Sequence, residues 1–110
     1  MRRSDFKRVY AGGTKVVGRY LVIFALAGEG EVRRLGITAT RKTGGAVVRN
    51  RARRRIRALA RTREAVLGSW GGEIVVNVRR GCAEVGWSAL AEEFERCMRK
   101  ATTAPRPPVS

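Results

Sequence analysis

Six arginines fall within nine residues between Arg49 and Arg57, in the run Arg-Asn-Arg-Ala-Arg-Arg-Arg-Ile-Arg. Guanidinium groups at this density suit phosphate binding, because each presents a rigid fork of donors to a phosphate or carboxylate. Neighbouring like charges also disfavour a helix unless a polyanion neutralises them. The run therefore predicts a surface that faces a phosphate backbone, rather than a helix face that is merely solvated.

Charges of opposite sign are segregated along the chain. The 110 residues carry 24 Lys and Arg against 9 Asp and Glu, a net charge of +15, and 20 of the cations are Arg. Twelve cations and no acid lie between Val32 and Arg63, whereas four acids and no cation lie between Glu84 and Glu95. A solvated surface would mix the signs, so the segregation predicts one face that binds a polyanion. Nucleic acid is the leading partner class, and an anionic membrane surface is the alternative.

Side chains suited to bond-breaking chemistry are scarce in this sequence. There is no His, so Ser-His and Cys-His nucleophile pairs and an imidazole base are absent. The acids show no pair that must converge on a substrate, and Glu92, Glu93 and Glu95 crowd what reads as a solvated helix face. Cys82 and Cys97 are too few for a zinc site, which takes about four ligands. We therefore expect two reduced thiols and no catalytic residue or metal ligand in this chain.

One domain is expected over residues 1–103, followed by a disordered Pro-rich tail over residues 104–110. No apolar run approaches the roughly 20 residues that cross a bilayer. The charged start is not followed by the apolar block of a secretory signal. These patterns predict a cytoplasmic protein, and the membrane-surface alternative is weakened because Trp70 and Trp87 lie outside the arginine run, so no membrane partner is expected.

A short helix is predicted near the N-terminus. Its apolar stripe consists of Phe6, Val9 and Tyr10, which recur at helical spacing. Ser4 is expected to cap this helix, and the glycines at 12 and 13 to end it.

Strands are predicted next. Residues 19–26 are β-branched and aromatic with two apolar faces, so both faces should be covered. Residues 33–40 alternate between an apolar face and a small polar face, as in a half-buried strand. The turn at 28–30 is short, which predicts that these two strands pair as an antiparallel hairpin. Residues 15–17 could add a further short strand.

The arginine run lies on a central helix predicted over residues 46–67. At about 100° per residue, one face is apolar and consists of Val48, Ala52, Ile56, Leu59 and Val66. The other sides carry Arg49, Asn50, Arg53, Arg54, Arg57 and Arg61. Arg55 falls at the edge of the apolar stripe, so we expect its stem to lie along the protein rather than contact a partner.

A last strand and a last helix complete the predicted fold. Residues 73–79 alternate around three apolar positions, as in a strand. Ser88 is expected to cap the final helix, which runs to about Lys100. Its core-facing side chains are expected to be Trp87, Leu90, Ala91, Phe94 and Met98. The order of helices and strands is typical of an α+β layer sandwich.

The segment from Ala46 to Arg57 resembles the "RNR" signature of the protein subunit of bacterial ribonuclease P. Further matches occur in the same order as in that family and span nearly the whole chain. They are Phe6-x-x-Val9-Tyr10, Arg34-Leu-Gly36-Ile-Thr38, the basic pair Arg41-Lys42, and Glu73-Ile-Val-Val76. Departures from the family pattern include Arg41, where Lys is usual, and Ala58, where an acid or amide is frequent.

The resemblance implies a fold and a function. The fold is an α-β-β-β-α-β-α two-layer sandwich with a small mixed sheet and an Arg-rich central helix. The function is that of an endoribonuclease subunit, in which an RNA component with Mg²⁺ removes the 5′ leader of precursor tRNA. The protein would bind ribonuclease P RNA and the leader, the RNA would hold most of the Mg²⁺, and no obligate protein partner is implied. A structural RNA-binding protein of ribosomal type is the alternative.

Two binding surfaces follow from the resemblance, position by position. The leader-binding set is Phe6, Tyr10, Val22, Phe24, Arg49 and Asn50. The set that contacts the RNA subunit is Arg41, Lys42, Arg51, Arg53, Arg54 and Arg57. Aromatic stacking on an unpaired base would contribute roughly 1–3 kcal/mol to the first surface.

Overall fold

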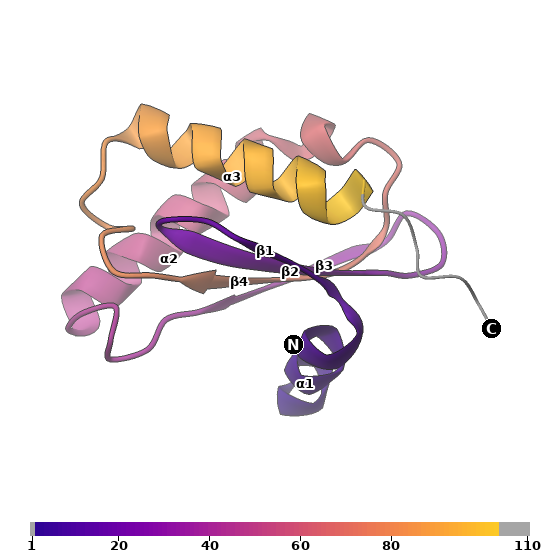
Figure 1. The fold of residues 1–110 in the computed structure, drawn as a ribbon, viewed down its shortest axis with the longest axis horizontal. Coiled ribbons are helices and arrows are strands. Elements are labelled where there is room, and N and C mark those ends of the chain that lie inside the picture. The colour runs from indigo at the N-terminus through magenta and orange to yellow at the C-terminus, as the bar shows by residue number, and fades with distance from the viewer. Residues whose placement is uncertain (1, 104–110) are drawn as a thin grey trace.

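The computed structural model describes residues 2–103 and shows the predicted α+β sandwich (Figure 1). The elements are α1 (Arg3–Gly12), β1 (Thr14–Val17), β2 (Leu21–Ala27), β3 (Arg33–Thr38), α2 (Ala46–Thr62), the 3₁₀ turn η1 (Glu64–Leu67), β4 (Gly72–Val78) and α3 (Trp87–Thr103). The short strand suggested at residues 15–17 is confirmed as β1. The tail predicted over residues 104–110 lies outside the described residues.

The four-stranded sheet has the order β1-β2-β4-β3. β2 pairs antiparallel with both β1 and β4, and β3 pairs parallel with β4. The predicted β2–β3 hairpin is therefore wrong, because β4 inserts between the two strands. Val75 and Val76 of β4 are both fully buried, and a strand that is apolar on both faces gains most in a central position. The half-polar β3 takes the edge instead.

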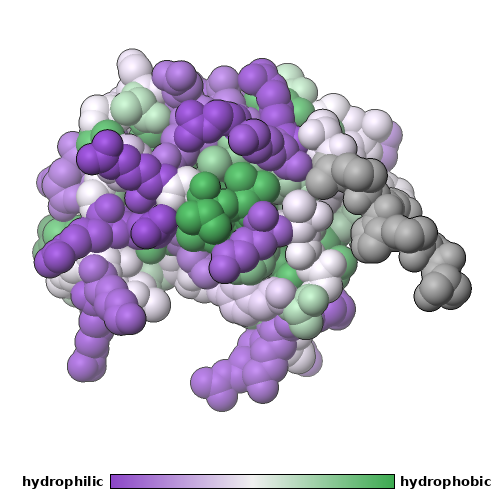
Figure 2. Space-filling model, in the orientation of Figure 1, coloured by the Kyte–Doolittle hydropathy of each residue, from purple (hydrophilic) through white to green (hydrophobic). Residues whose placement is uncertain are grey.

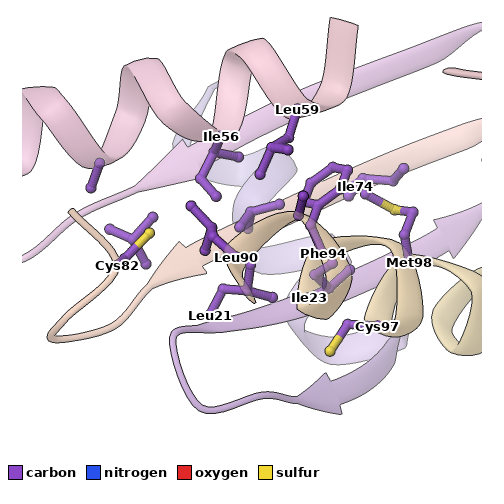
Figure 3. Close-up of a cluster of buried hydrophobic side chains, with 14 of the residues drawn as sticks. Leu21, Ile23, Ile56, Leu59, Ile74, Cys82, Leu90, Phe94, Cys97 and Met98 are labelled. Atoms are coloured by element: carbon purple, nitrogen blue, oxygen red, sulfur yellow. The ribbon is translucent and has the colours of Figure 1, made fainter. Parts of the chain in front are cut away.

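Helices cover the two faces of the sheet unequally (Figure 1). α2 and α3 lie on one face, where the main core forms, and α1 lies on the other. Ile56 and Leu59 of α2 point toward Leu90 and Phe94 of α3, above the sheet (Figure 3). All four side chains are buried. One face is thus a closed core, while α1 leaves part of the opposite face open.

The central helix is shorter than predicted. α2 ends at Thr62, and the chain continues into η1 instead of remaining helical to residue 67. Arg63 leaves helical geometry at φ −122° and ψ 30°, and its Nε donates to Glu95 Oε1 at 3.0 Å. This contact with α3 ends the helix where side-chain periodicity alone predicts a continuation. Val66 still packs against the core from η1, half-buried.

Both predicted serine caps are wrong. Arg2 occupies the N-cap position of α1, and its backbone N–H donates to Asp5 Oδ2 at 2.8 Å. Ser88 lies inside α3, which begins at Trp87. A carboxylate within the first turn satisfies a free backbone N–H as a capping hydroxyl would, so Ser4 is not needed.

Trp87 does not pack on the sheet as predicted. Its side chain is 43% exposed, and the Arg55 guanidinium lies 5.6 Å from its ring centroid. Arg55 also donates to the carbonyl oxygens of Cys82 at 2.7 Å and Val85 at 2.6 Å. The prediction that Arg55 turns toward the protein is confirmed, and it ties α2 to the segment between β4 and α3.

Glu93 is not on a solvated helix face. It is only 4% exposed, and its carboxylate accepts the backbone N–H groups of Arg19 at 2.7 Å and Tyr20 at 2.8 Å. A buried carboxylate needs such donors, because desolvation is otherwise too costly. Glu93 therefore fastens the β1–β2 turn to α3.

The two cysteines are free and buried, as expected of reduced thiols. Burial raises the pKa of the Cys82 thiol to about 11 and also raises the pKa of Cys97. Both thiols are therefore protonated near neutral pH, which makes them poor nucleophiles. Within residues 2–103, no helix is both long enough and apolar enough to span a membrane.

Candidate nucleic-acid interface

The register of the sheet arranges the open face in rows. Val22 of β2 lies opposite Asn77 of β4, and Asn77 lies opposite Thr38 of β3. The next row joins Phe24 and Val75, and both rows lie on the face that carries α1. Residues from the beginning, middle and end of the chain are therefore neighbours, because β4 inserts between β2 and β3.

Ion pairs fasten α1 to this face. Asp5 Oδ1 and Oδ2 lie 3.1 Å from the guanidinium nitrogens of Arg8 and Arg34, respectively. Arg8 also pairs with Glu73, and Arg34 Nη1 lies 3.6 Å from Glu73 Oε2. The Arg2 backbone N–H, followed by Arg34 and Arg8, lowers the pKa of Asp5 despite the desolvation that opposes it. The hydrogen bond to Glu73 raises the pKa of Arg8.

This cluster bears on the expectation that no pair of acids must converge on a substrate. Asp5 and Glu73 do come together, but two arginines occupy the space between them. Their carboxylates are therefore neutralised by the protein and are poorly suited to hold a metal ion. Among residues 2–103, no group of three or more Cys, Asp or Glu side chains is placed to bind one.

Aromatic side chains form one wall of the open face. The Tyr10 ring packs edge-on against Phe24, with 4.7 Å between centroids, and lies 6.5 Å from the Phe6 ring. Lys15 Nζ lies 5.7 Å from the Phe24 centroid. Phe6 and Phe24 are half-buried, whereas Tyr10 is 38% exposed. Four members of the predicted leader-binding set, Phe6, Tyr10, Val22 and Phe24, thus belong to this face.

A groove of about 930 Å³ continues from Tyr10 past the ends of β3 and β4; we call it the Tyr10 groove. Its lining residues are Tyr10, Thr38, Thr40, Arg41, Lys42, Thr43, Asn77, Val78, Arg79 and Arg80. Arg41 and Lys42, which the resemblance places against the RNA subunit, therefore lie beside the leader-binding aromatics.

Sequence reasoning placed Thr38 on a small polar face that a ligand could approach, but it missed Asn77, Arg79 and Arg80 as groove residues. Two features of the sequence could have identified them. Strand alternation places position 77 on the same face as position 75, and two consecutive arginines, Arg79 and Arg80, follow. Arg79 has a structural task as well, because its Nη1 donates to the Gly18 carbonyl at 2.7 Å. Its backbone N–H donates to the Tyr20 carbonyl at 2.8 Å, which continues the pairing of β4 with β2.

The exposed side of α2 forms the second surface, which we call the α2 face. A shallow hollow there is lined by Val47, Asn50, Arg53, Arg54 and Arg57. Arg53 Nη1 donates to Asn50 Oδ1 at 3.2 Å. Asn50, which the resemblance places on the leader surface, therefore sits among the arginines predicted to contact the RNA subunit.

Arg49 and Arg51 flank the α2 face. Arg49 is half-buried, and its Nε is buried without a hydrogen-bond partner among the described residues. It does not line the Tyr10 groove. Arg51 is exposed. The hollow on α2 thus brings together four of the predicted contacts, Asn50, Arg53, Arg54 and Arg57, and neither Arg49 nor Asn50 lines the Tyr10 groove.

The arginines of the α2 face are not neutralised by the protein. Within residues 2–103, the ion pairs involve the arginines at positions 8, 34, 63 and 96 and none on that face. Figure 2, which views the molecule from the side of α3, shows many hydrophilic side chains and a hydrophobic patch near the centre of that face. Uncompensated, closely spaced guanidinium groups repel one another, so an external polyanion would stabilise them.

Comparison with known proteins gives a consistent result. A family model described as Ribonuclease P matches residues 1–102. The ribonuclease P protein component of Acidothermus cellulolyticus is 38% identical over 103 residues, covering 92% of this chain and 85% of that protein. The corresponding protein of Gluconacetobacter diazotrophicus is 38% identical over 101 residues, covering 91% and 87%.

Solved structures agree with this result. The RNase P protein from Thermotoga maritima matches with a TM-score of 0.81 and 27% identity, over 91% of this chain and 94% of that one. The RNase P protein of Staphylococcus aureus matches with a TM-score of 0.79 and 25% identity, over 94% and 95%. These matches favour the resemblance drawn from the sequence over the ribosomal-type alternative.

Proposed function

This chain belongs to the Ribonuclease P protein family and is a subunit of that endoribonuclease, and from this premise we propose that it binds two RNAs at once. The α2 face would grip ribonuclease P RNA, and the Tyr10 groove would hold the single-stranded 5′ leader of precursor tRNA. Two observations carry the proposal. The exposed Tyr10 ring lies in a groove that basic side chains also line. The arginines of α2 have no ion-pair partners within residues 2–103.

The Tyr10 groove has the chemistry of a single-strand site. Proteins that bind unpaired RNA combine aromatic platforms for bases with cations that follow the backbone. Tyr10 supplies an exposed ring, and Arg41, Lys42 and Arg80 supply charge along the same groove. A mature tRNA has no leader, so contacts here would favour precursor over product.

The α2 face suits a folded RNA better than a single strand. Its arginines project from a rigid helix that Ile56 and Leu59 anchor in the core. Fixed spacing lets several phosphates be met at once with little ordering cost. Each neutralised phosphate releases counterions, which makes this contact strongly salt-dependent.

Cleavage itself is proposed to be carried by the RNA component with Mg²⁺. The acids that converge in this chain, Asp5 and Glu73, are occupied by Arg8 and Arg34, and both buried thiols are protonated. Protein side chains would therefore position the substrate and screen phosphate repulsion between the two RNAs. Most of the metal would be held by phosphates of the RNA partner.

Reconstitution tests this function directly. Adding the protein to ribonuclease P RNA at low Mg²⁺ should restore cleavage of precursor tRNA at the leader junction. A basic, unrelated RNA-binding protein at equal concentration controls for general charge screening. Cleavage that is no better than with this control would refute the proposal.

A further inference from the structure

A second pocket opens between α2 and β3, on the face of the sheet that α2 and α3 cover; we call it the Leu35 pocket. Its volume is about 290 Å³, and α2, β3, β4, η1 and α3 all contribute side chains to its lining. It shares Arg57 with the α2 face and no residue with the Tyr10 groove. The Leu35 pocket is therefore a separate feature that neither proposed RNA contact accounts for.

The floor of the Leu35 pocket is apolar. Leu35 lies opposite Ile74 in the pairing of β3 with β4, so both side chains are on the covered face of the sheet. Ile74, Phe94 and Met98 are buried in the core (Figure 3). Leu35 is nevertheless 37% exposed. The only apolar side chain that α2 adds to the pocket is the methyl group of Ala60, which leaves Leu35 accessible.

Arginines surround this floor, and they differ in whether the protein uses them. Arg33, Arg34 and Arg63 each donate to other groups of the protein. Arg57 and Arg61 are exposed, and their side chains have no ion-pair partner within residues 2–103. Two free guanidinium groups beside an apolar floor fit a ligand that has an apolar body and a negative charge.

The Leu35 pocket is continuous with the α2 face. Asn50, Arg54, Arg57 and Arg61 recur at spacings of four, three and four residues, so they form one row along α2. Arg57 lines both the hollow on the α2 face and the Leu35 pocket. An RNA strand whose phosphates follow this row therefore arrives at the rim of the pocket.

We propose that the Leu35 pocket receives one unpaired base of ribonuclease P RNA, while the phosphates beside that base meet Arg57 and Arg61. The inference rests on the proposed contact between the α2 face and this RNA. Unpaired bases of a folded RNA can be splayed away from their neighbours and bound by protein. A volume of about 290 Å³ is near the lower end for small-molecule pockets, so it suits one planar ring system rather than a peptide helix. Glu64 also lines the pocket and can accept from an N–H group on the edge of a base.

Filling the pocket tests the proposal. In Ala60→Leu the larger side chain occupies the space that the base needs, so binding to ribonuclease P RNA should weaken about tenfold. The log–log salt slope should keep its wild-type value, because no phosphate contact is removed. Arg61→Ala should instead lower the slope by about 0.7–0.9. Ala89→Leu makes the same change at an exposed position of α3 and should leave both the affinity and the slope unchanged.

Methionine labelling observes the pocket without altering it. The chain has two methionines, Met1 and Met98, so protein labelled with ¹³C at the methionine methyl groups gives two methyl signals. Met98 lines the pocket, and the ring of a bound base should shift its signal when ribonuclease P RNA is added. The shift should be absent from Ala60→Leu at RNA concentrations that saturate the variant.

Two results would overturn the proposal. The first is a Met98 signal that saturating RNA leaves unchanged in the wild-type protein. The second is a folded Ala60→Leu variant that binds the RNA as tightly as the wild type, which would leave the pocket to a protein or small-molecule partner. An RNA affinity and salt slope that survive the loss of Arg53, Arg54 and Arg57 would instead overturn the role proposed for the α2 face.

Discussion

The α2 face and the Tyr10 groove differ in how the protein satisfies their polar groups. On the α2 face, Arg54 and Arg57 find no ion-pair partner within residues 2–103, and Arg53 only bonds the nearby Asn50. In and beside the groove, Tyr10 and Thr38 bond Asn77. The first surface leaves its guanidinium groups without ion-pair partners among the described residues, whereas hydrogen bonds within the protein hold the second surface in one arrangement.

The two surfaces also differ in how much of the chain each one needs. The α2 face is local, because a single helix carries all of its groups. The Tyr10 groove needs α1, β3, β4 and the segment after β3, and its hydrogen bonds join residues 67 and 39 positions apart. Affinity can therefore come from a short stretch of sequence, while selectivity depends on the complete fold. Three predictions test this division.

The largest effect is expected on the α2 face. Replacing Arg53, Arg54 and Arg57 together by Ala should lower the log–log salt slope of binding to ribonuclease P RNA by about 2–3 units, at about 0.7–0.9 per lost phosphate contact. Binding measured across a salt series gives this slope. Arg99→Ala removes an exposed cation from α3 and should leave the slope unchanged. A triple variant with the wild-type slope would show that these arginines do not contact phosphates.

A smaller and more selective effect is expected in the Tyr10 groove. Tyr10→Ala removes the exposed ring and should weaken holoenzyme binding of precursor tRNA by about 1–3 kcal/mol. Mature tRNA should be unaffected, and the loss should be similar at low and high salt, because stacking is not screened. Tyr10→Phe keeps the ring without the hydroxyl and should retain most of the binding. Equal losses for precursor and mature tRNA would argue against a leader site.

The smallest effect concerns the attachment of α1. The pKa of Asp5 is lowered in the folded protein, first by the Arg2 backbone N–H and then by Arg34 and Arg8. Ionised Asp5 therefore stabilises the fold above its unfolded pKa of about 3.9, and that stabilisation is lost as the pH falls through the lower folded value. Urea unfolding should show a steeper loss of stability below about pH 4 for the wild type than for Asp5→Asn. Parallel pH profiles would mean that Asp5 does not contribute in this way.

Local patterns predicted the α2 face well. Helical periodicity separated Ala52, Ile56 and Leu59, all buried, from the arginines, and it placed Arg55 against the protein. It failed where tertiary contacts end a helix, as at Arg63 beside Glu95. The roles assigned to individual residues toward the two RNAs stay predictions until the variants are measured.

The Tyr10 groove was predicted only in part. The resemblance marked Phe6, Tyr10, Val22 and Phe24, which do share one face of the sheet. Asn77 escaped notice because the predicted hairpin paired β3 with β2 and left β4 unplaced. The wrong pairing thus hid the neighbours of Tyr10, although each strand was identified correctly.

By itself the sequence determined the elements, the family and the uncompensated positive charge, since these depend on residue type and on spacing within a few turns of chain. Tertiary structure alone decided that β4 separates β2 from β3, that Asp5 meets Glu73 across two arginines, and that the Asn77 side-chain oxygen accepts from Tyr10 and Thr38. The physical reason is that the order of strands depends on which strand can bury both of its faces. That in turn depends on segments that are distant in the sequence, so no local pattern contains the answer.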